Sequence, residues 1–185
     1  PFLRETLQRH GDLVREAVEA HPLNQPTTED SLRQRWQQYL ADVTDEPSLH
    51  RALRRFRRES QFRMIWRDAL KLADYHETVA AASDFADIGI QAALDWLYPK
   101  ACEELGTPHG EDPVTGKQAP QPLIVLGMGK LGGHELNISS DIDLIFAFPG
   151  KGETQGGRRS LDNQQFFIRL GQKLIQALDQ ITADG

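Results

Sequence analysis

The chain has 185 residues, 39% of them hydrophobic and 26% charged, with a formal net charge of -6 at pH 7. This length allows one sizeable hydrophobic core or two small domains. The acidic balance argues against a general nucleic-acid-binding protein, whose affinity depends on clustered lysine and arginine.

The composition also argues against a membrane protein and against a disulfide-stabilised one. No stretch reaches the roughly 18–20 apolar residues that span a bilayer. Cys102 is the single cysteine and has no partner in the chain for a disulfide. We therefore expect a cytoplasmic protein in a reducing compartment, with no membrane and no nucleic-acid partner.

Residues 1–105 are predicted to form a helical region. Apolar residues recur there at steps of three and four positions, which predicts helices over about residues 2–20, 28–43, 47–75 and 83–105. Thr28 is suited to cap the second helix, and Pro47 is suited to the first turn of the third.

One part of this region is strongly basic. Seven arginines and one glutamate lie between Arg51 and Arg67. Four of the arginines repeat at helical intervals: Arg51, Arg54, Arg55 and Arg58. Such a run is usually a solvated helix face or one paired with acidic neighbours. The alternative is a docking surface for an acidic partner or a phosphate.

The pattern changes after residue 105. Residues 106–121 contain three glycines and three prolines and are predicted to be a loop or linker. Residues 122–185 are predicted to be a small α/β core, with strands at 122–127 and 141–148 and a helix at 161–179. The fold class expected for the whole chain is therefore α+β.

A glycine-rich turn follows the first of these strands. Gly127, Gly129 and Gly132 match the G-x-G-x-x-G fingerprint of dinucleotide-binding proteins. However, only eight residues separate Gly132 from Asp141, whereas a crossover between parallel strands needs at least about 10–12 residues. The spacing disfavours a nicotinamide or flavin site.

The second strand is predicted to begin with two aspartates, Asp141 and Asp143, on either side of Ile142. Side chains two apart in a strand point the same way, with Cα atoms about 6.5–7 Å apart. Two such carboxylates are suited to a pair of Mg²⁺ ions in phosphoryl or nucleotidyl transfer. Paired aspartates alone often only solubilise a strand end, but a glycine turn ten residues upstream strengthens the metal interpretation.

This combination resembles the signature of the nucleotidyltransferase superfamily, in which a turn of small residues precedes two aspartates separated by an apolar residue. Lys130 departs from the serine commonly found in that turn. The segment GMGKLGGHELNISSDIDLIF, residues 127–146, is similar to the hallmark of the bifunctional glutamine synthetase adenylyltransferase/adenylyl-removing family. The stretches LRRFRRESQFRMIW and TQGGRRSLDNQQFFIRLGQKLI support the resemblance, which covers about residues 49–185.

The resemblance implies a partial nucleotidyltransferase fold and a specific activity. The family carries two nucleotidyltransferase units, and GMGKLGG with ELNISSDIDL resembles the amino-terminal one. That unit removes AMP from the modified tyrosine of glutamine synthetase with inorganic phosphate and releases ADP. The other unit adds AMP from ATP.

The resemblance also implies roles for individual residues. The carboxylates that hold Mg²⁺, or Mn²⁺, would be Asp141 and Asp143. The phosphate and nucleotide contacts would come from Gly129, Lys130, Gly132, Gly133, Ser139 and Ser140. We expect His134 and Glu135 to be structural or exposed rather than catalytic.

Partners follow from the resemblance in the same way: adenylylated glutamine synthetase, the PII signal protein, ADP or ATP, inorganic phosphate, and glutamine as an effector. A third carboxylate is expected beyond residue 185, so the fragment alone is expected to be inactive. The alternatives are an adenylyltransferase that uses ATP, a nucleotidyltransferase with another acceptor, and a non-catalytic docking module.

Overall fold

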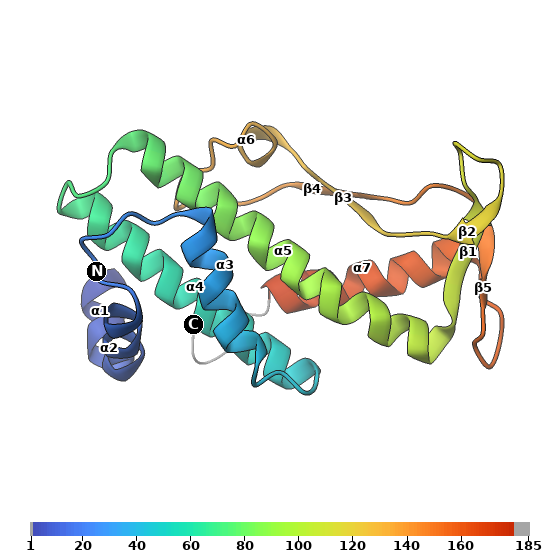
Figure 1. Cartoon of the computed structure of the whole chain (residues 1–185), viewed down its shortest axis with the longest axis horizontal. Coiled ribbons are helices and arrows are strands. Elements are labelled where there is room, and N and C mark those ends of the chain that lie inside the picture. Colours follow the sequence, from blue (N-terminus) through green and yellow to red (C-terminus); the bar gives the residue numbers. More distant parts are fainter. Residues whose placement is uncertain (1, 180–185) are drawn as a thin grey trace. The chain divides into compact units, whose positions relative to one another are not determined.

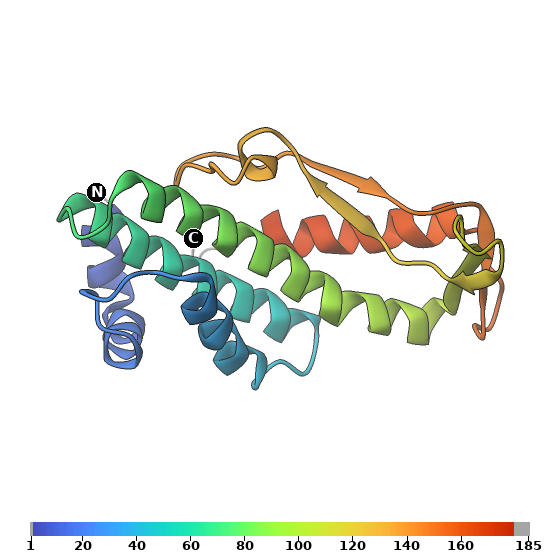
Figure 2. The ribbon, with the colours of Figure 1, turned by 45° about the horizontal axis from the view of Figure 1, so that its top comes forward.

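A computed structural model describes residues 2–179 (Figures 1 and 2). The chain forms two compact units, which alternate along the sequence. The first, called the helical unit here, contains residues 2–89 and 129–142. The second, called the mixed unit, contains residues 90–128 and 143–179. Helices accompanied by small antiparallel sheets confirm the predicted α+β class.

The helical unit is built around α4. Its helices are α1 (Phe2–Arg9), α2 (Gly11–Ala20), α3 (Glu29–Leu40), α4 (Glu46–Ala69), the first part of α5 (Tyr75–Leu105) and the short α6 (Gly129–Gly132). Helices α1, α2 and α3 all pack against α4, and the beginning of α5 runs beside it (Figure 1). Phe56 is 1% exposed and contacts the rings of Trp36, Tyr39 and Phe85, which makes it the centre of this core.

The starts of the second and third predicted helices are correct to within one residue, and each has an N-cap side chain. Thr28 caps α3 and Asp45 caps α4, each in a reciprocal pair of hydrogen bonds with the serine three residues later. The predicted single helix over residues 2–20 is wrong, because the chain breaks at His10 between α1 and α2. Helix α5 begins at Tyr75 rather than near residue 83, because the Asp74 carboxylate accepts the Glu77 amide and starts the helix earlier.

Two arginines of the basic segment, Arg63 and Arg67, lie inside the helical unit rather than on its surface. The guanidinium of Arg67 is 2% exposed and forms two hydrogen bonds with the Glu77 carboxylate, at 2.7 and 2.9 Å. It also donates to the carbonyls of Leu23 and Leu72. Arg67 therefore ties α4, the start of α5 and the loop before α3 together.

The Glu77–Arg67 pair makes stability depend on pH. Burial raises the pKa of Glu77, but hydrogen bonds from Arg67 and from the Thr27 amide outweigh it and lower the pKa. A carboxyl whose folded pKa is depressed stabilises the fold above its unfolded pKa, and this stabilisation is lost as pH falls through the folded value. We expect urea denaturation at pH 7, 5 and 3 to show a steeper loss of stability in the parent than in Glu77→Gln. Parallel pH profiles would contradict this.

The mixed unit contains two antiparallel sheets. One has the strand order β2-β1-β5, formed by β1 (Thr107–Glu111), β2 (Gln118–Pro120) and β5 (Gly152–Gln155). The other is a two-stranded ribbon of β3 (Ile124–Gly127) and β4 (Leu144–Ala147), in which Gly127 pairs with Leu144. Figure 2 shows these two strands side by side. The second part of α5 and α7 (Asn163–Asp179) complete the unit.

Several predictions for this part need correction. Residues 106–121, expected to be a loop, contain β1 and β2. Strand β5 lies between the strand predicted at 141–148 and the helix predicted at 161–179, where no element was predicted. Strand β1 reads Thr-Pro-His-Gly-Glu, which lacks apolar alternation and contains two residues that disfavour strands, so its sequence gives no strand signal. It forms because both of its edges are paired. Strands β3 and β4 are both shorter than predicted.

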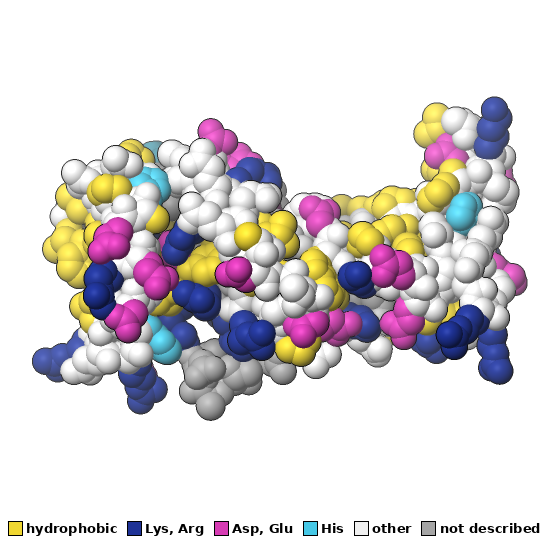
Figure 3. All heavy atoms as spheres, turned by 60° about the horizontal axis from the view of Figure 1, so that its bottom comes forward, with side chains coloured by type: hydrophobic (Ala, Val, Ile, Leu, Met, Phe, Trp, Pro, Cys, Tyr) yellow, Lys and Arg dark blue, Asp and Glu magenta, His cyan; other side chains and the backbone are white. Residues whose placement is uncertain are grey.

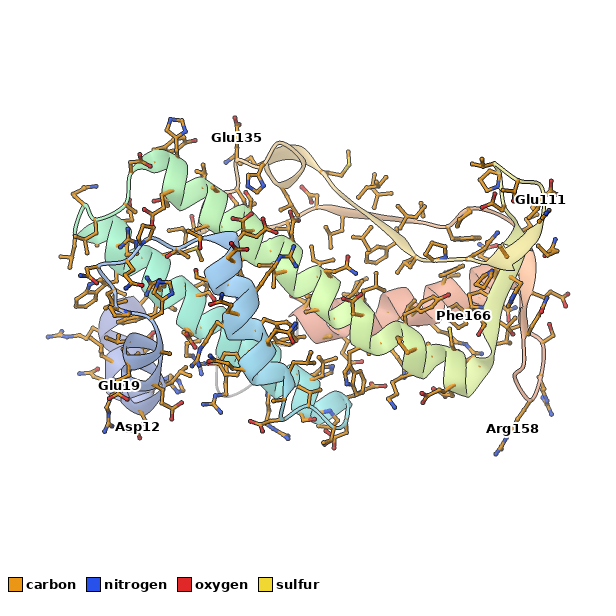
Figure 4. All side chains as sticks on the ribbon, viewed as in Figure 1. Asp12, Glu19, Glu111, Glu135, Arg158 and Phe166 are labelled. Atoms are coloured by element: carbon orange, nitrogen blue, oxygen red, sulfur yellow. The ribbon has the colours of Figure 1, made fainter. Side chains whose placement is uncertain are left out.

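The helix predicted at 161–179 is present as α7, from Asn163 to Asp179, and one of its faces is apolar. Phe166, Phe167, Leu170 and Leu174 are buried, whereas Ile175 is 51% exposed. Phe166, labelled in Figure 4, makes an edge contact with Tyr98 of α5. Residues 180–185, near which a further strand was predicted to begin, lie outside the described residues. Among the helices in residues 2–179, none is long and apolar enough to cross a membrane.

A close backbone approach fixes the identity of Gly152. A Cβ atom added there would lie 1.9 Å from the His109 carbonyl oxygen of β1 and 2.9 Å from the Asn163 side-chain nitrogen. We expect Gly152→Ala to destabilise the protein by about 1–3 kcal/mol, because paired strands must separate to admit the methyl group. Gly89→Ala is the control, since a Cβ there meets nothing within 4 Å. A thermal melt showing equal effects for the two variants would contradict this account.

Candidate functional site

The glycine turn begins with a residue that only glycine fits comfortably. Gly129 has a φ of +55°, in the left-handed region that other residues adopt at a cost. A Cβ at this position would meet nothing within 4 Å. Glycine is therefore favoured at position 129 because of the backbone conformation, and not because a larger side chain would clash.

Three backbone hydrogen bonds close the turn on itself. The amide of Gly133 donates to the Gly129 carbonyl at 3.0 Å, that of His134 to Leu131 at 3.0 Å, and that of Glu135 to Lys130 at 2.8 Å. The amides of residues 133–135 are consequently engaged within the turn. An anion bound at the turn would therefore accept hydrogen bonds from other N–H groups. The role of Gly133 would be to leave space for the anion, because it has no side chain.

The turn is open to solvent on one side and anchored on the other. The four residues predicted to contact phosphate are all exposed: Gly129, Lys130, Gly132 and Gly133. Leu131, between them, is 5% exposed. Glu135 follows the turn, and its side chain points away from the backbone of this segment (Figure 4). His134 and Glu135 are both exposed, which agrees with the exposed alternative of the prediction.

The segment between the turn and β4 carries the remaining predicted residues. Ser139 is exposed, and Ser140 is partly buried and donates its amide to the Asn137 carbonyl at 3.0 Å. Asp141 and Asp143 are both exposed, whereas Ile142 between them is partly buried. The aspartates precede β4 instead of starting it, so the predicted strand boundary is wrong, but the alternation of exposure is present.

The backbone of Asp143 continues the ribbon of the mixed unit. Its carbonyl accepts the Met128 amide at 2.9 Å, one position beyond the last pair of β3 and β4. The backbone of Asp143 is therefore fixed, while its side chain is exposed. Asp141 and the glycine turn belong to the helical unit, so the predicted site residues are divided between the two units.

The two carboxylates are chemically suited to a divalent cation. Neither Asp141 nor Asp143 has a hydrogen bond or ion pair to a side chain in residues 2–179. Over the same range, no three His, Cys, Asp or Glu residues are grouped to hold a metal ion. Mg²⁺ in nucleotide enzymes is typically held by one or two carboxylates together with waters and substrate phosphates. Two free aspartates fit that mode.

Comparison with known proteins identifies the family. The family model described as glutamate-ammonia ligase adenylyltransferase matches residues 1–185. The chain belongs to this family. It is 50% identical over 184 residues to the bifunctional glutamine synthetase adenylyltransferase/adenylyl-removing enzyme of Pseudomonas aeruginosa. The match covers 100% of this chain and 18% of that relative, so the chain spans less than a fifth of the relative's length.

In this member of the adenylyltransferase family, several arginines of the basic segment, residues 51–67, stabilise the fold through contacts inside the helical unit. Arg63 and Arg67 are 8% and 2% exposed, and Arg55 pairs with Glu16 at 3.3 Å. On the face drawn in Figure 3, basic and acidic side chains are interspersed and form no continuous basic surface. These contacts do not favour a docking surface for an acidic partner.

Two other acidic residues of the mixed unit have local hydrogen-bond partners. The Asp162 carboxylate accepts the Gln164 amide at 2.8 Å at the start of α7, and Glu153 accepts the Ser160 hydroxyl at 2.8 Å. Both hydrogen bonds stabilise the mixed unit.

Sequence reasoning missed two residues that contact the segment after the glycine turn. The Ser83 hydroxyl accepts the Leu136 amide, and the Asp84 carboxylate lies near the His134 ring. Both residues lie on α5, more than 40 positions before the turn. A serine and an aspartate within a helical pattern carry no signal of such a distant contact.

Proposed function

We propose that this chain carries the nucleotide-handling elements of an adenylyl-removing unit. The unit transfers AMP from an adenylylated tyrosine of glutamine synthetase to inorganic phosphate and releases ADP. One observation carries the proposal: in a member of the adenylyltransferase family, the segment between β3 and β4 contains a glycine turn and two exposed aspartates that pair with no side chain of residues 2–179.

The proposed reaction is a single displacement at phosphorus. An oxygen of inorganic phosphate forms a bond to the AMP phosphorus, and the bond from phosphorus to the tyrosine oxygen breaks. The tyrosine oxygen leaves with the bonding electrons and takes a proton. Asp141 and Asp143 would hold Mg²⁺, or Mn²⁺, which supplies positive charge to the attacking and leaving oxygens when bound.

The glycine turn would contact the phosphate groups. Lys130 is exposed and carries a positive charge, and the turn has no side chain at Gly129, Gly132 and Gly133 to obstruct an anion. Because the Gly133 amide is used inside the turn, hydrogen bonds to phosphate would come from other groups. Ser139 and Ser140 are the nearby hydroxyls in sequence and would contact the nucleotide.

The direction of the reaction rests on motif resemblance. GMGKLGG and ELNISSDIDL resemble the amino-terminal unit of the family, which removes AMP. The Pseudomonas relative is named for both activities. Adenylylation from ATP is therefore the alternative, and the two directions are distinguished by whether inorganic phosphate or ATP is consumed.

The wider context of the proposal comes from the family. The protein substrate would be adenylylated glutamine synthetase, and the regulators would be the PII signal protein and glutamine, in the cytoplasm. A third carboxylate would come from sequence after residue 185. Since the chain spans 18% of the relative, we propose that turnover requires the full-length protein and that this segment alone is inactive.

A calorimetric titration with ADP tests the proposal. The full-length protein is titrated in Mg²⁺ or Mn²⁺ and again in chelator, with Asp143→Asn as the comparison. We expect metal-dependent binding that is lost in the variant. Binding that ignores metal would instead favour a dinucleotide-type site, and an absence of binding in the full-length protein would contradict the proposal.

A further inference from the structure

Helix α5 holds the segment that closes the glycine turn. Ser83 and Asp84, adjacent on this helix, contact Leu136 and His134 respectively. We propose that Ser83 and Asp84 are positioning residues that keep the glycine turn in the conformation that receives phosphate. The functional part of this inference rests on the proposed function above, whereas the positioning itself does not.

The hydroxyl of Ser83 makes two hydrogen bonds, one within its own helix and one to the segment that follows the glycine turn. It donates to the Val79 carbonyl at 2.8 Å and accepts the Leu136 amide at 3.1 Å. Ser83 is 0% exposed and Leu136 is 5% exposed, so water does not readily replace this bond. Because the hydroxyl hydrogen is directed to Val79, an oxygen lone pair is left for the loop amide. Loss of the hydroxyl would leave a buried amide without an acceptor.

The second contact holds a residue in an unfavourable conformation. His134 has a φ of +56°, which is uncommon for a residue with a side chain. The His134 Nε2 atom lies 3.4 Å from a carboxylate oxygen of Asp84, and the side chain of Asp84 is 16% exposed. Residues in such conformations persist where the surrounding structure fixes them. The contact with Asp84, together with the hydrogen bond from the His134 amide to the Leu131 carbonyl, supplies that restraint.

The charges around Asp84 support its pairing with His134. Burial raises the pKa of Asp84, and His134 acts against this as the largest opposing influence. Three other groups act on Asp84: Glu29 and Asp87 raise its pKa, and Arg33 lowers it. Glu29 and Arg33 are paired with each other at 2.7 Å. His134 is therefore the principal group that offsets the desolvation of this carboxylate.

Together these contacts connect the helical region to the turn. The backbone bonds from residues 133–135 fix the shape of the turn, and the contacts at 134 and 136 fix its position on α5. Residues 129–142 accordingly belong to the same compact unit as the amino-terminal helices. A glycine-rich loop held in place before the ligand arrives loses less conformational freedom on binding.

Two measurements on the full-length protein test this inference. Hydrogen–deuterium exchange of residues 128–137 reports the order of the turn without nucleotide, and calorimetry reports ADP affinity in Mg²⁺. For Ser83→Ala we expect the Leu136 amide to exchange at least about tenfold faster and ADP affinity to fall by roughly three- to tenfold. The control is Ser60→Ala, which removes a buried helical serine of α4 and should change neither quantity.

Asp84→Asn and His134→Asn test the second contact at positions that do not threaten folding. Asparagine tolerates the left-handed conformation of residue 134. Each single variant should speed exchange in the turn, and the double variant should be no worse than the more severe single one, because both remove the same interaction. Additive effects of the two substitutions would show that the residues act separately and would overturn this part of the inference.

The outcomes distinguish the inference from the proposed function. Unchanged exchange in Ser83→Ala and Asp84→Asn would overturn the positioning role, whatever the nucleotide results. Faster exchange with unchanged ADP affinity would overturn its importance for phosphate binding. If the parent protein fails to bind ADP, the proposed function fails, and the exchange measurements still decide whether α5 positions the turn.

Discussion

Replacing Asp143 by asparagine is expected to reduce phosphorolysis of adenylylated glutamine synthetase by roughly 10²–10³-fold or more, as expected for loss of charge stabilisation at the reacting phosphate. The fold should be retained. The Asp143 side chain is exposed and makes no hydrogen bond or ion pair within residues 2–179, while its backbone carbonyl still accepts the Met128 amide. Steady-state release of ADP, measured in the full-length protein, reports the loss.

The control for this variant is Glu111→Gln. Glu111 is an exposed carboxylate of the same mixed unit, on β1, and its removal changes the net charge by the same amount (Figure 4). It should leave turnover unchanged. An Asp143→Asn protein with turnover within tenfold of the parent would contradict the assignment of Asp143 as a metal ligand.

Replacing Arg63 by methionine is expected to have the largest effect on stability. Arg63 lies inside the helical unit, where its guanidinium donates to the Thr27 hydroxyl at 3.0 Å and to the carbonyls of His21, Pro22 and Gln25 at 2.6–3.1 Å. Burial, followed by the charge of Arg67, lowers the pKa of Arg63 to about 10. At neutral pH the group is still charged and holds the loop between α2 and α3.

The expected cost is about 3–5 kcal/mol, because methionine fills the space but leaves several buried acceptors without a donor. Urea denaturation with Arg57→Met as the control measures it. Arg57 is an exposed arginine of the same helix, and its loss should cost less than about 0.5 kcal/mol. Equal stabilities for the two variants would show that the buried network contributes little.

The helices of this protein could be predicted from the sequence because their signals are local. Thr28 and Asp45 each satisfy the first amides of a helix with their own side chains, and apolar periodicity marks the buried faces. The glycine turn and the aspartate pair were also recognisable, since Gly129, Asp141 and Asp143 form a pattern within 15 positions.

The features that sequence reasoning missed depend on residues distant in the chain. Strand β1 contains Pro108 and Gly110 and forms because β2 and β5 pair with it. Arg63 belongs to a segment that looks like a basic surface, and only the loop folded over it shows that it is interior. The contact of Ser83 with Leu136 spans 53 positions and has no sequence pattern.

The central claim is that AMP is transferred from a protein tyrosine to inorganic phosphate. The most direct test incubates the full-length protein with adenylylated glutamine synthetase, Mg²⁺ and radiolabelled inorganic phosphate, and follows the label. We predict that it appears in ADP, as its terminal phosphate, at the rate at which adenylyl groups leave glutamine synthetase. Release of AMP without labelled ADP, or no release under any effector condition, would contradict the account.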